Sequence, residues 1–217
     1  MSARKRVAIL ISGRGSNMEA LIAAARDPAY PAEIALVVSN LPGVQGLDKA
    51  KAAGVPTLVV NHRTYPSRMA FEMRVHAALL EKKIDLVCNA GFMRLLTAEF
   101  VNRWRDRHLN IHPSLLPAFA GLDTHARVID QGVRITGCTV HFVRVEMDAG
   151  PIIAQAAVPV ADGDTPDTLA ARVLAAEHRL YPHALALVAS GRTVVASERV
   201  LIRAGAPPAG EIFSPPL

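Results

Sequence analysis

The stretch Val7-Ala8-Ile9-Leu10-Ile11-Ser12-Gly13-Arg14-Gly15-Ser16-Asn17 decides the fold class of this chain. It begins as a buried strand over 7–12, turns at its glycines and leads into a helical pattern over 17–26. A strand that passes through glycines directly into a helix is the opening unit of many α/β folds. The glycines let the backbone turn tightly, and the unpaired N–H groups at the start of a helix attract anions. We therefore expect an anion-binding loop after the first strand.

This loop departs from the dinucleotide fingerprint, which requires Gly-x-Gly-x-x-Gly and a later acidic residue for the ribose. Asn17 occupies one place where that pattern could continue with a small residue. A phosphate monoester therefore fits the loop better than NAD. The alternative is a tight strand-to-helix connection that binds nothing.

Strand and helix patterns continue to alternate through the first 90 residues, which predicts a parallel sheet covered by helices. Further strands are expected over 34–39, 57–60 and 85–89, and further helices over 44–53 and from Pro66 to about Lys83.

The second half of the chain is predicted to be less regular. Residues 97–104 read as helix, 108–112 as an extended segment, 135–146 and 152–158 as an antiparallel pair, and 194–202 as edge strands. A long helix from Pro166 to about Ser190 is capped by Thr165. The expected fold is α/β, a mostly parallel twisted sheet flanked by helices with antiparallel strands in the C-terminal half.

Composition narrows the class of protein. Of 217 residues, 51% are apolar and 20% charged, and the net charge is +5, which excludes a disordered chain. We expect one domain over 1–217, with its core at about 6–190 and a mobile tail over 204–217. No apolar run is long enough for a membrane helix and no signal peptide is visible, so a cytoplasmic protein with reduced Cys88 and Cys138 is expected. Basic residues form only short clusters with little aromatic interleaving, which favours small anionic substrates over nucleic acid.

A second motif is Leu109-Asn110-Ile111-His112-Pro113. Residues two apart on an extended segment face the same side, so Asn110 and His112 should point together. Pro113 restrains His112 to an extended conformation. An amide donor beside an imidazole suits a developing oxyanion and a proton transfer. The alternative is a polar histidine that is merely hydrogen-bonded at a strand end.

A third motif is the turn Asp148-Ala149-Gly150-Pro151, preceded on one strand face by Thr139 and His141. Aspartate is also a common turn residue, so this motif alone is weak. Glu177 lies within the long helix at the border of its packed face, where an ordinary exposed glutamate is the alternative. His125 is expected near the start of a short helix.

These motifs, with Ala90-Gly91-Phe92-Met93-Arg94 and Gly121-Leu122-Asp123-Thr124-His125, occur in the order and at the spacing of the phosphoribosylglycinamide formyltransferase family, which the chain closely resembles over about 6–190. The resemblance implies a Rossmann-like formyltransferase fold. It implies transfer of the formyl group of 10-formyltetrahydrofolate to the amino group of N1-(5-phospho-D-ribosyl)glycinamide in purine biosynthesis, through a tetrahedral intermediate and without a metal. It leaves open whether the protein is a monomer or a homodimer.

The resemblance also assigns roles to residues of this sequence. Asn110 and His112 are expected to bind the formyl oxygen, and Asp148 to move a proton from the amine to the folate nitrogen. Gly15, Ser16, Asn17 and Glu177 match the positions that bind the ribonucleotide. The positions near the folate are Arg68, Met93, Arg94, Leu95, Leu96, Asn110, Arg144, Val145, Glu146, Met147 and Asp148, and Thr139 and His141 match the supporting shell.

Two departures from the family pattern stand out. Ala118-Phe119-Ala120 replaces a basic residue and Tyr-Pro, and Asn89 replaces an apolar residue and needs a hydrogen-bond partner if buried.

Other enzymes that use the same donor are the nearest alternatives. Methionyl-tRNA and sugar-nucleotide formyltransferases add a domain after this core, and formyltetrahydrofolate hydrolase adds one before it; we expect this chain to have room for neither. A non-enzymatic nucleotide-binding module is a further alternative, but it does not explain why Asn110, His112 and Asp148 occur together.

Overall fold

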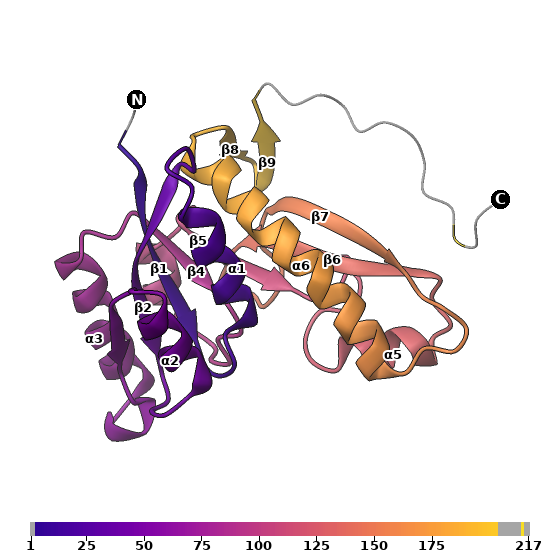
Figure 1. Cartoon of the computed structure of the whole chain (residues 1–217), viewed down its shortest axis with the longest axis horizontal. Helices are drawn as coiled ribbons and strands as arrows, with labels where there is room; N and C mark the ends of the chain where they lie inside the picture. The colour runs from indigo at the N-terminus through magenta and orange to yellow at the C-terminus, as the bar shows by residue number, and fades with distance from the viewer. Residues whose placement is uncertain (1–2, 204–213, 215–217) are drawn as a thin grey trace.

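The computed structural model describes residues 3–203 and 214 and is built around a seven-stranded sheet in the order β3-β2-β1-β4-β5-β6-β7 (Figure 1). The parallel strands are β1 (Lys5–Ile11), β2 (Ala32–Ser39), β3 (Thr57–Val59), β4 (Leu86–Asn89) and β5 (His108–His112). The antiparallel strands are β6 (Ile135–Phe142) and β7 (Ile152–Pro159). The predicted α/β class, with antiparallel strands late in the chain, is confirmed.

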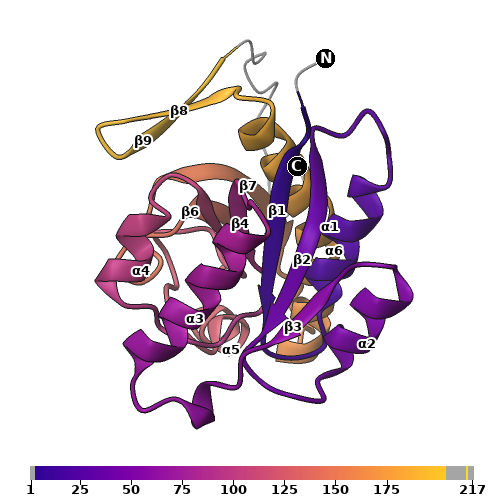
Figure 2. The same ribbon diagram turned by 90° about the vertical axis from the view of Figure 1, so that its left-hand side faces the viewer.

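Helices cover both faces of the parallel part of the sheet (Figure 2). One face carries α1 (Ser16–Ala25), α2 (Gln45–Ala52) and α6 (Pro166–Ala189), and the other carries α3 (Arg68–Glu81) and α4 (Ala98–Arg103). The strands are apolar on both sides because both faces are buried. In β1, for example, Val7, Ile9 and Ile11 face one core and Ala8 and Leu10 face the other. A short α5 (Thr124–Asp130) packs against α6, and a 3₁₀ turn, η1 (His62–Thr64), precedes α3.

On the face of the sheet that carries α3 and α4, loops instead of helices lie over β5 and β6. Leu109 and Val140 point into the core on the α6 side, so their neighbours Asn110 and His141 point to the opposite face. His112 on the same strand as Asn110 contacts the segments that follow β5 and β6, through the Phe119 oxygen at 3.0 Å and Asp148 Oδ2 at 3.4 Å. This arrangement positions the candidate site.

The helix boundaries follow their caps closely. Thr165 caps α6 at its expected start, with the N–H of Thr168 donating to Thr165 Oγ1 at 3.3 Å. Helix α3 begins at Arg68 rather than Pro66, because the Ser67 hydroxyl accepts the N–H of Ala70 at 3.1 Å.

Two segments differ from expectation. The strand predicted over 135–146 ends at Phe142, because Val143–Gly150 leaves the ladder as a loop. The strands expected over 194–202 exist as β8 (Thr193–Ala196) and β9 (Arg199–Ile202), but they pair only with each other and add no edge to the main sheet. The expected mobile tail lies outside the described residues apart from Ser214. No helix in the described part of the chain is both long and apolar enough to span a membrane.

Asn89 has the buried partner that its position requires. Its Oδ1 lies 2.9 Å from Nε2 of His108 on the neighbouring strand, and both residues are buried. Burial lowers the pKa of His108 to about 3, with the nearby His141 adding to the effect. The imidazole is therefore neutral and donates from Nε2, which satisfies the amide oxygen.

This buried histidine predicts acid sensitivity. The folded-state pKa lies below the ordinary value of about 6.5, so the stability it contributes is complete above that pH and is lost as the pH falls. We expect His108→Gln, which keeps a donor for Asn89, to flatten the fall in the free energy of unfolding between about pH 6.5 and 5 by up to ~1.4 kcal/mol per pH unit. Urea titrations of both proteins across that range measure it, and parallel pH profiles would contradict the assignment.

Candidate active site

The carboxyl ends of β1, β4 and β5 meet where the winding of the sheet reverses, since β2 and β3 lie on one side of β1 and β4 and β5 on the other. Such a switch point is the usual ligand-binding crevice of an open α/β sheet. Predicted site residues lie after β1 (15–17) and after β4 (93–96), and Asn110 and His112 lie on β5 itself.

The loop after β1 ends in a left-handed residue. Gly15 has a φ of 73°, and a Cβ there would lie 3.1 Å from Gly46 Cα, so two constraints favour glycine. No side chain caps α1, which leaves the N–H groups of Ser16 and Asn17 available to a ligand. The predicted phosphate-binding residues therefore lie together at the start of α1.

Ser12 connects this loop to the segment after β4. Its hydroxyl donates to Asn40 Oδ1 at 2.6 Å and accepts the N–H of Met93 at 2.8 Å. The sequence places Ser12 in the glycine motif but predicts no role for it. Through its bond to Met93, Ser12 holds the glycine loop and the segment after β4 together at the carboxyl ends of the strands.

Asn17 and Glu177 meet from helices far apart in the sequence. Asn17 Nδ2 donates to Glu177 Oε2 at 2.7 Å, and both side chains are buried. Burial raises the pKa of Glu177, while the bond from Asn17 opposes that shift. Asn17 Oδ1 has no protein partner within the described residues. A buried acceptor pair of this kind suits an amine or hydroxyl donor from a ligand.

Asn110 and His141 lie directly opposite each other on β5 and β6. His141 Nδ1 is 3.0 Å from the carbonyl oxygen of Phe142, which only accepts, so Nδ1 carries the proton. Burial lowers the pKa of His141 and keeps it neutral. Its Nε2 then accepts from Asn110 Nδ2 at 3.2 Å, which fixes the amide and leaves its second N–H free.

His112 lies between a carbonyl oxygen and a carboxylate. Its Nε2 is 3.0 Å from the oxygen of Phe119, and its Nδ1 is 3.4 Å from Asp148 Oδ2. The first contact requires a proton on Nε2, and protonation of Nδ1 as well makes the second an ion pair. Both side chains are less than a tenth exposed. The structure thus brings together two residues that are 36 positions apart in the sequence.

Asp148 itself is held in an uncommon conformation. Its φ is 56°, in the left-handed region that aspartate tolerates better than most residues. Its Oδ2 accepts the N–H of Gly121 at 2.9 Å, and Oδ1 is 3.9 Å from His141 Nε2. Backbone strain of this kind often marks functional sites.

Thr139 fixes the loop that follows His112. Its hydroxyl donates to the carbonyl oxygen of Ser114 at 2.7 Å and accepts the N–H of Leu116 at 3.0 Å. These contacts join β6 to the loop that follows His112.

Comparison with known proteins gives the chain a family. A formyl transferase model matches residues 5–185. The trifunctional purine biosynthetic protein adenosine-3 of Bos taurus is 55% identical over 188 residues, which are 87% of this chain and 19% of that protein. Phosphoribosylglycinamide formyltransferase of Escherichia coli strain K12 is 40% identical over 186 residues, covering 86% of this chain and 88% of that protein. The crystal structure of glycinamide ribonucleotide transformylase 1 from Symbiobacterium toebii matches with a TM-score of 0.91 and 45% identity, covering 94% of this chain and 96% of that one.

The chain belongs to the phosphoribosylglycinamide formyltransferase family. The reaction of this family is formyl transfer from formyltetrahydrofolate to glycinamide ribonucleotide in de novo purine biosynthesis. The predictions of the family, the enzyme class and the formyltransferase fold are confirmed. The chain spans only 19% of the trifunctional relative's length, so the other activities of that protein carry no implication here.

The residues matched to the family's folate site have mostly accessible side chains. Met93, Leu95, Val145 and Met147 are large exposed apolar side chains, Glu146 is exposed, and Leu96 is half-buried. Arg94 Nε is buried without a protein partner in the described region. Arg68 is exposed at the start of α3. Arg144 differs from the others, because its guanidinium is engaged by Asp106 and Glu198.

His125, for which the sequence predicts no role, lies in a partly buried polar environment. Burial lowers its pKa, and the electrostatic interaction with His112 adds to the effect. Its Nδ1 has no partner among the described residues. The signal was its place after Gly121-Leu122-Asp123-Thr124, which by itself did not reveal that this segment bonds to Asp148.

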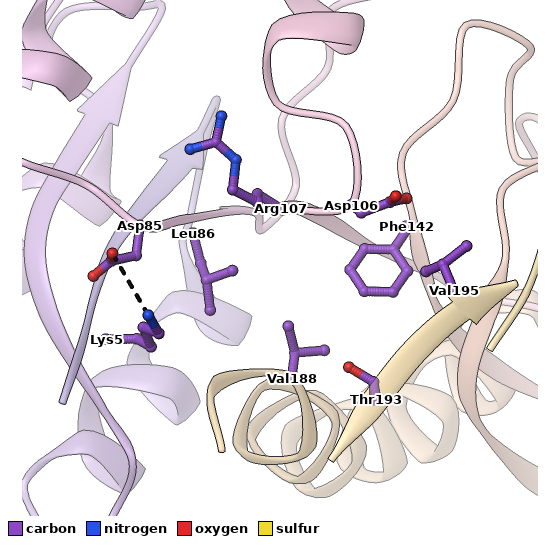
Figure 3. A pocket seen from close by; sticks show the side chains of 9 residues that line it. All are labelled: Lys5, Asp85, Leu86, Asp106, Arg107, Phe142, Val188, Thr193 and Val195. Carbon is purple, nitrogen blue, oxygen red and sulfur yellow. Dashed lines mark ion pairs between the residues drawn. The ribbon is translucent and has the colours of Figure 1, made fainter. Parts of the chain in front are cut away.

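A separate cavity of about 290 Å³ lies at the opposite edge of the sheet in this family member (Figure 3). It is lined by Lys5, Asp85, Leu86, Asp106, Arg107, Phe142, Val188, Thr193 and Val195. Lys5 and Asp85 point toward each other across one side, with Nζ and Oδ1 3.9 Å apart. No predicted site residue lines this cavity.

In the described part of the chain, no three His, Cys, Asp or Glu residues are grouped as metal ligands.

Proposed function

We propose that this chain transfers the formyl group of 10-formyltetrahydrofolate to the amino group of N1-(5-phospho-D-ribosyl)glycinamide. The observation that carries the proposal is the convergence of Asn110, His112 and Asp148, in a chain that also forms the buried Asn17–Glu177 pair at the start of α1. A nucleotide-binding module would need the glycine loop alone. We also propose one catalytic domain over 1–217, and a cytoplasmic location is supported by the purine-biosynthetic role of the family.

The formyl oxygen becomes negatively charged when the amine attacks the formyl carbon. The free N–H of Asn110 supplies a donor on one face of β5. A protonated His112 adds positive charge on the same face, while its Nε2 and Nδ1 face the Phe119 oxygen and Asp148. Asp148 beside Nδ1 stabilises the imidazolium. Donors fixed before the reaction stabilise an oxyanion without reorganisation, and removal of one typically costs ~2.7–4 kcal/mol of barrier.

The attacking amine must lose a proton and the folate nitrogen must gain one. Asp148 Oδ2 lies 3.4 Å from His112 Nδ1, and its Oδ1 accepts no hydrogen bond from the described residues. It can accept the amine proton and return it to the leaving nitrogen, with water as the carrier. A positioned acid–base group of this kind supplies about 10²–10⁴-fold in rate.

The ribonucleotide and the folate are assigned to different sides of Asn110, His112 and Asp148. The N–H groups of Gly15, Ser16 and Asn17 suit the phosphate at the start of α1. Glu177 suits the amine end or a ribose hydroxyl. The exposed apolar side chains of Met93, Leu95 and Met147, with the unpartnered Arg94 Nε, suit the folate ring and its polar edge.

Replacing Glu177 should weaken binding of the ribonucleotide and stabilise the fold at alkaline pH. We expect Glu177→Gln to raise KM for the ribonucleotide at least about tenfold, because a hydrogen bond to a charged group contributes ~1.5–3 kcal/mol, while KM for the folate changes little. Since burial raises its pKa in the folded chain, the ionised carboxylate destabilises the fold at alkaline pH and not below about pH 4. The variant should therefore be more stable at about pH 8 and unchanged at about pH 4. Equal KM changes for both substrates would remove Glu177 from nucleotide binding.

Acceptor dependence tests the proposed function against hydrolysis. Purified protein is mixed with 10-formyltetrahydrofolate, with and without the ribonucleotide, and tetrahydrofolate release is followed by absorbance. We expect release to require the acceptor. Release at the same rate without it would favour a hydrolase.

A further inference from the structure

Arg144 is the largely buried member of an ion-pair cluster whose acidic partners, Asp106 and Glu198, are exposed. Its Nε donates to Glu198 Oε2 at 2.6 Å and its Nη2 to Asp106 Oδ1 at 2.6 Å, and its side chain is only 9% exposed. The other oxygen of Glu198 pairs with Arg105. Hydrogen bonding from Arg144, with added attraction from Arg105, holds the pKa of Glu198 below its usual range, so the pair is charged at neutral pH.

Glu198 is presented by the hairpin of β8 and β9. Ala196 and Arg199 pair directly, so the connecting turn consists of Ser197 and Glu198, with φ values of 48° and 57°. This is the turn geometry that suits the twist of a two-residue hairpin and usually requires glycine or asparagine. Figure 1 shows the hairpin beyond the end of α6, apart from the seven-stranded sheet. A turn that keeps two side chains in an unfavourable conformation suggests that Glu198 has a use there.

Arg144 also lies near the start of the loop that carries Asp148. The neck of that loop is fixed, because the N–H of Val143 donates to the carbonyl oxygen of His108 at 2.7 Å and that of Phe142 to Pro151 at 2.9 Å. Gly150 closes the neck so tightly that a Cβ there would lie 1.7 Å from the Phe142 oxygen. Beyond the neck, Val145, Glu146 and Met147 are exposed. Side-chain anchoring of the loop therefore comes from Arg144 at one end and Asp148 at the other.

We propose that Glu198 is a positioning residue, which acts through Arg144 to fix the loop that carries Asp148 and the folate-facing residues. The proposal rests on the proposed function. Its basis is that the hairpin touches the loop through this charged pair, while Arg105 and Asp106 tie the same cluster to the turn before β5. The hairpin thus links the end of α6 to the catalytic carboxylate.

The test compares Glu198→Gln with Glu99→Gln, which breaks an exposed ion pair to Arg103 on α4 and serves as the control. We expect Glu198→Gln to raise KM for 10-formyltetrahydrofolate and lower kcat by about two- to fivefold each, the range for a partly exposed pair, with KM for the ribonucleotide unchanged. Hydrogen exchange over residues 143–149 should quicken in this variant and not in the control. Unchanged folate kinetics together with unchanged exchange would overturn the proposal.

A double-variant cycle shows whether Arg144 transmits the effect. In an Arg144→Gln background, we expect Glu198→Gln to change neither kcat nor loop exchange further. A full additional effect in that background would mean that Glu198 acts by another route and would contradict the proposal. Exchange and calorimetric binding of tetrahydrofolate do not require turnover. A wild-type chain that binds tetrahydrofolate but transfers no formyl group would therefore refute the proposed function and leave the positioning role open to the same test.

Discussion

Asp148→Asn should lower kcat by at least about 10²-fold, because the amide can neither accept the amine proton nor stabilise a charged His112. The fold should be preserved. Asparagine tolerates a left-handed φ as well as aspartate does, and its oxygen can still accept the N–H of Gly121. Steady-state kinetics at saturating concentrations of both substrates measure the change.

Asp162→Asn is the matched control, since Asp162 is an exposed carboxylate whose partner is Arg134. That variant should retain wild-type kcat. Near-normal turnover of Asp148→Asn, with unfolding transitions equal in the two variants, would remove Asp148 from the mechanism.

Asn110→Ala is expected to have a comparable effect for a different reason. The variant loses the N–H that would face the formyl oxygen, and one lost oxyanion donor typically costs ~2.7–4 kcal/mol, or about 10²–10³-fold in kcat. Because the donor acts mainly as charge develops, both KM values should change far less than kcat.

Asn102→Ala, on the exposed side of α4, controls for loss of an amide side chain. The pH dependence of the Asn110→Ala variant gives a second readout, because His141 loses the donor to its Nε2. If KM for the folate rose while kcat stayed constant, Asn110 would bind the ground state and the oxyanion role would be wrong.

The sheet was predictable from the sequence because its signals are local. Apolar runs bounded by glycine and proline mark the strands, and caps such as Thr165 mark helix starts within a residue or two. The end of β6 was not predictable, because the apolar pattern of 135–146 continues past Phe142. Where the strand ends, Gly150 packs so closely on the Phe142 backbone that it leaves no room for a Cβ, and the apolar pattern does not reveal this contact.

Candidate site residues could be proposed from the sequence, but most of the contacts between them could not be predicted. Two-residue spacing placed Asn110 and His112 on one face, and the register with β6 adds His141 to that face. The 3.4 Å approach of Asp148 to His112 depends on how a loop folds back over the sheet, which residue spacing does not encode. The partner of Asn89 and the Arg144–Glu198 pair are likewise tertiary contacts between segments without a recognisable motif.

Following an isotopic label in the formyl group tests most directly whether this chain is a transferase. The wild-type protein is incubated with the ribonucleotide and 10-formyltetrahydrofolate isotopically labelled in the formyl group, and the products are separated and counted. We predict that label appears in the formylated ribonucleotide in equal amount to the tetrahydrofolate released, with no label in formate above the enzyme-free control. Label that accumulates in formate, with the ribonucleotide unmodified, would contradict the transferase assignment.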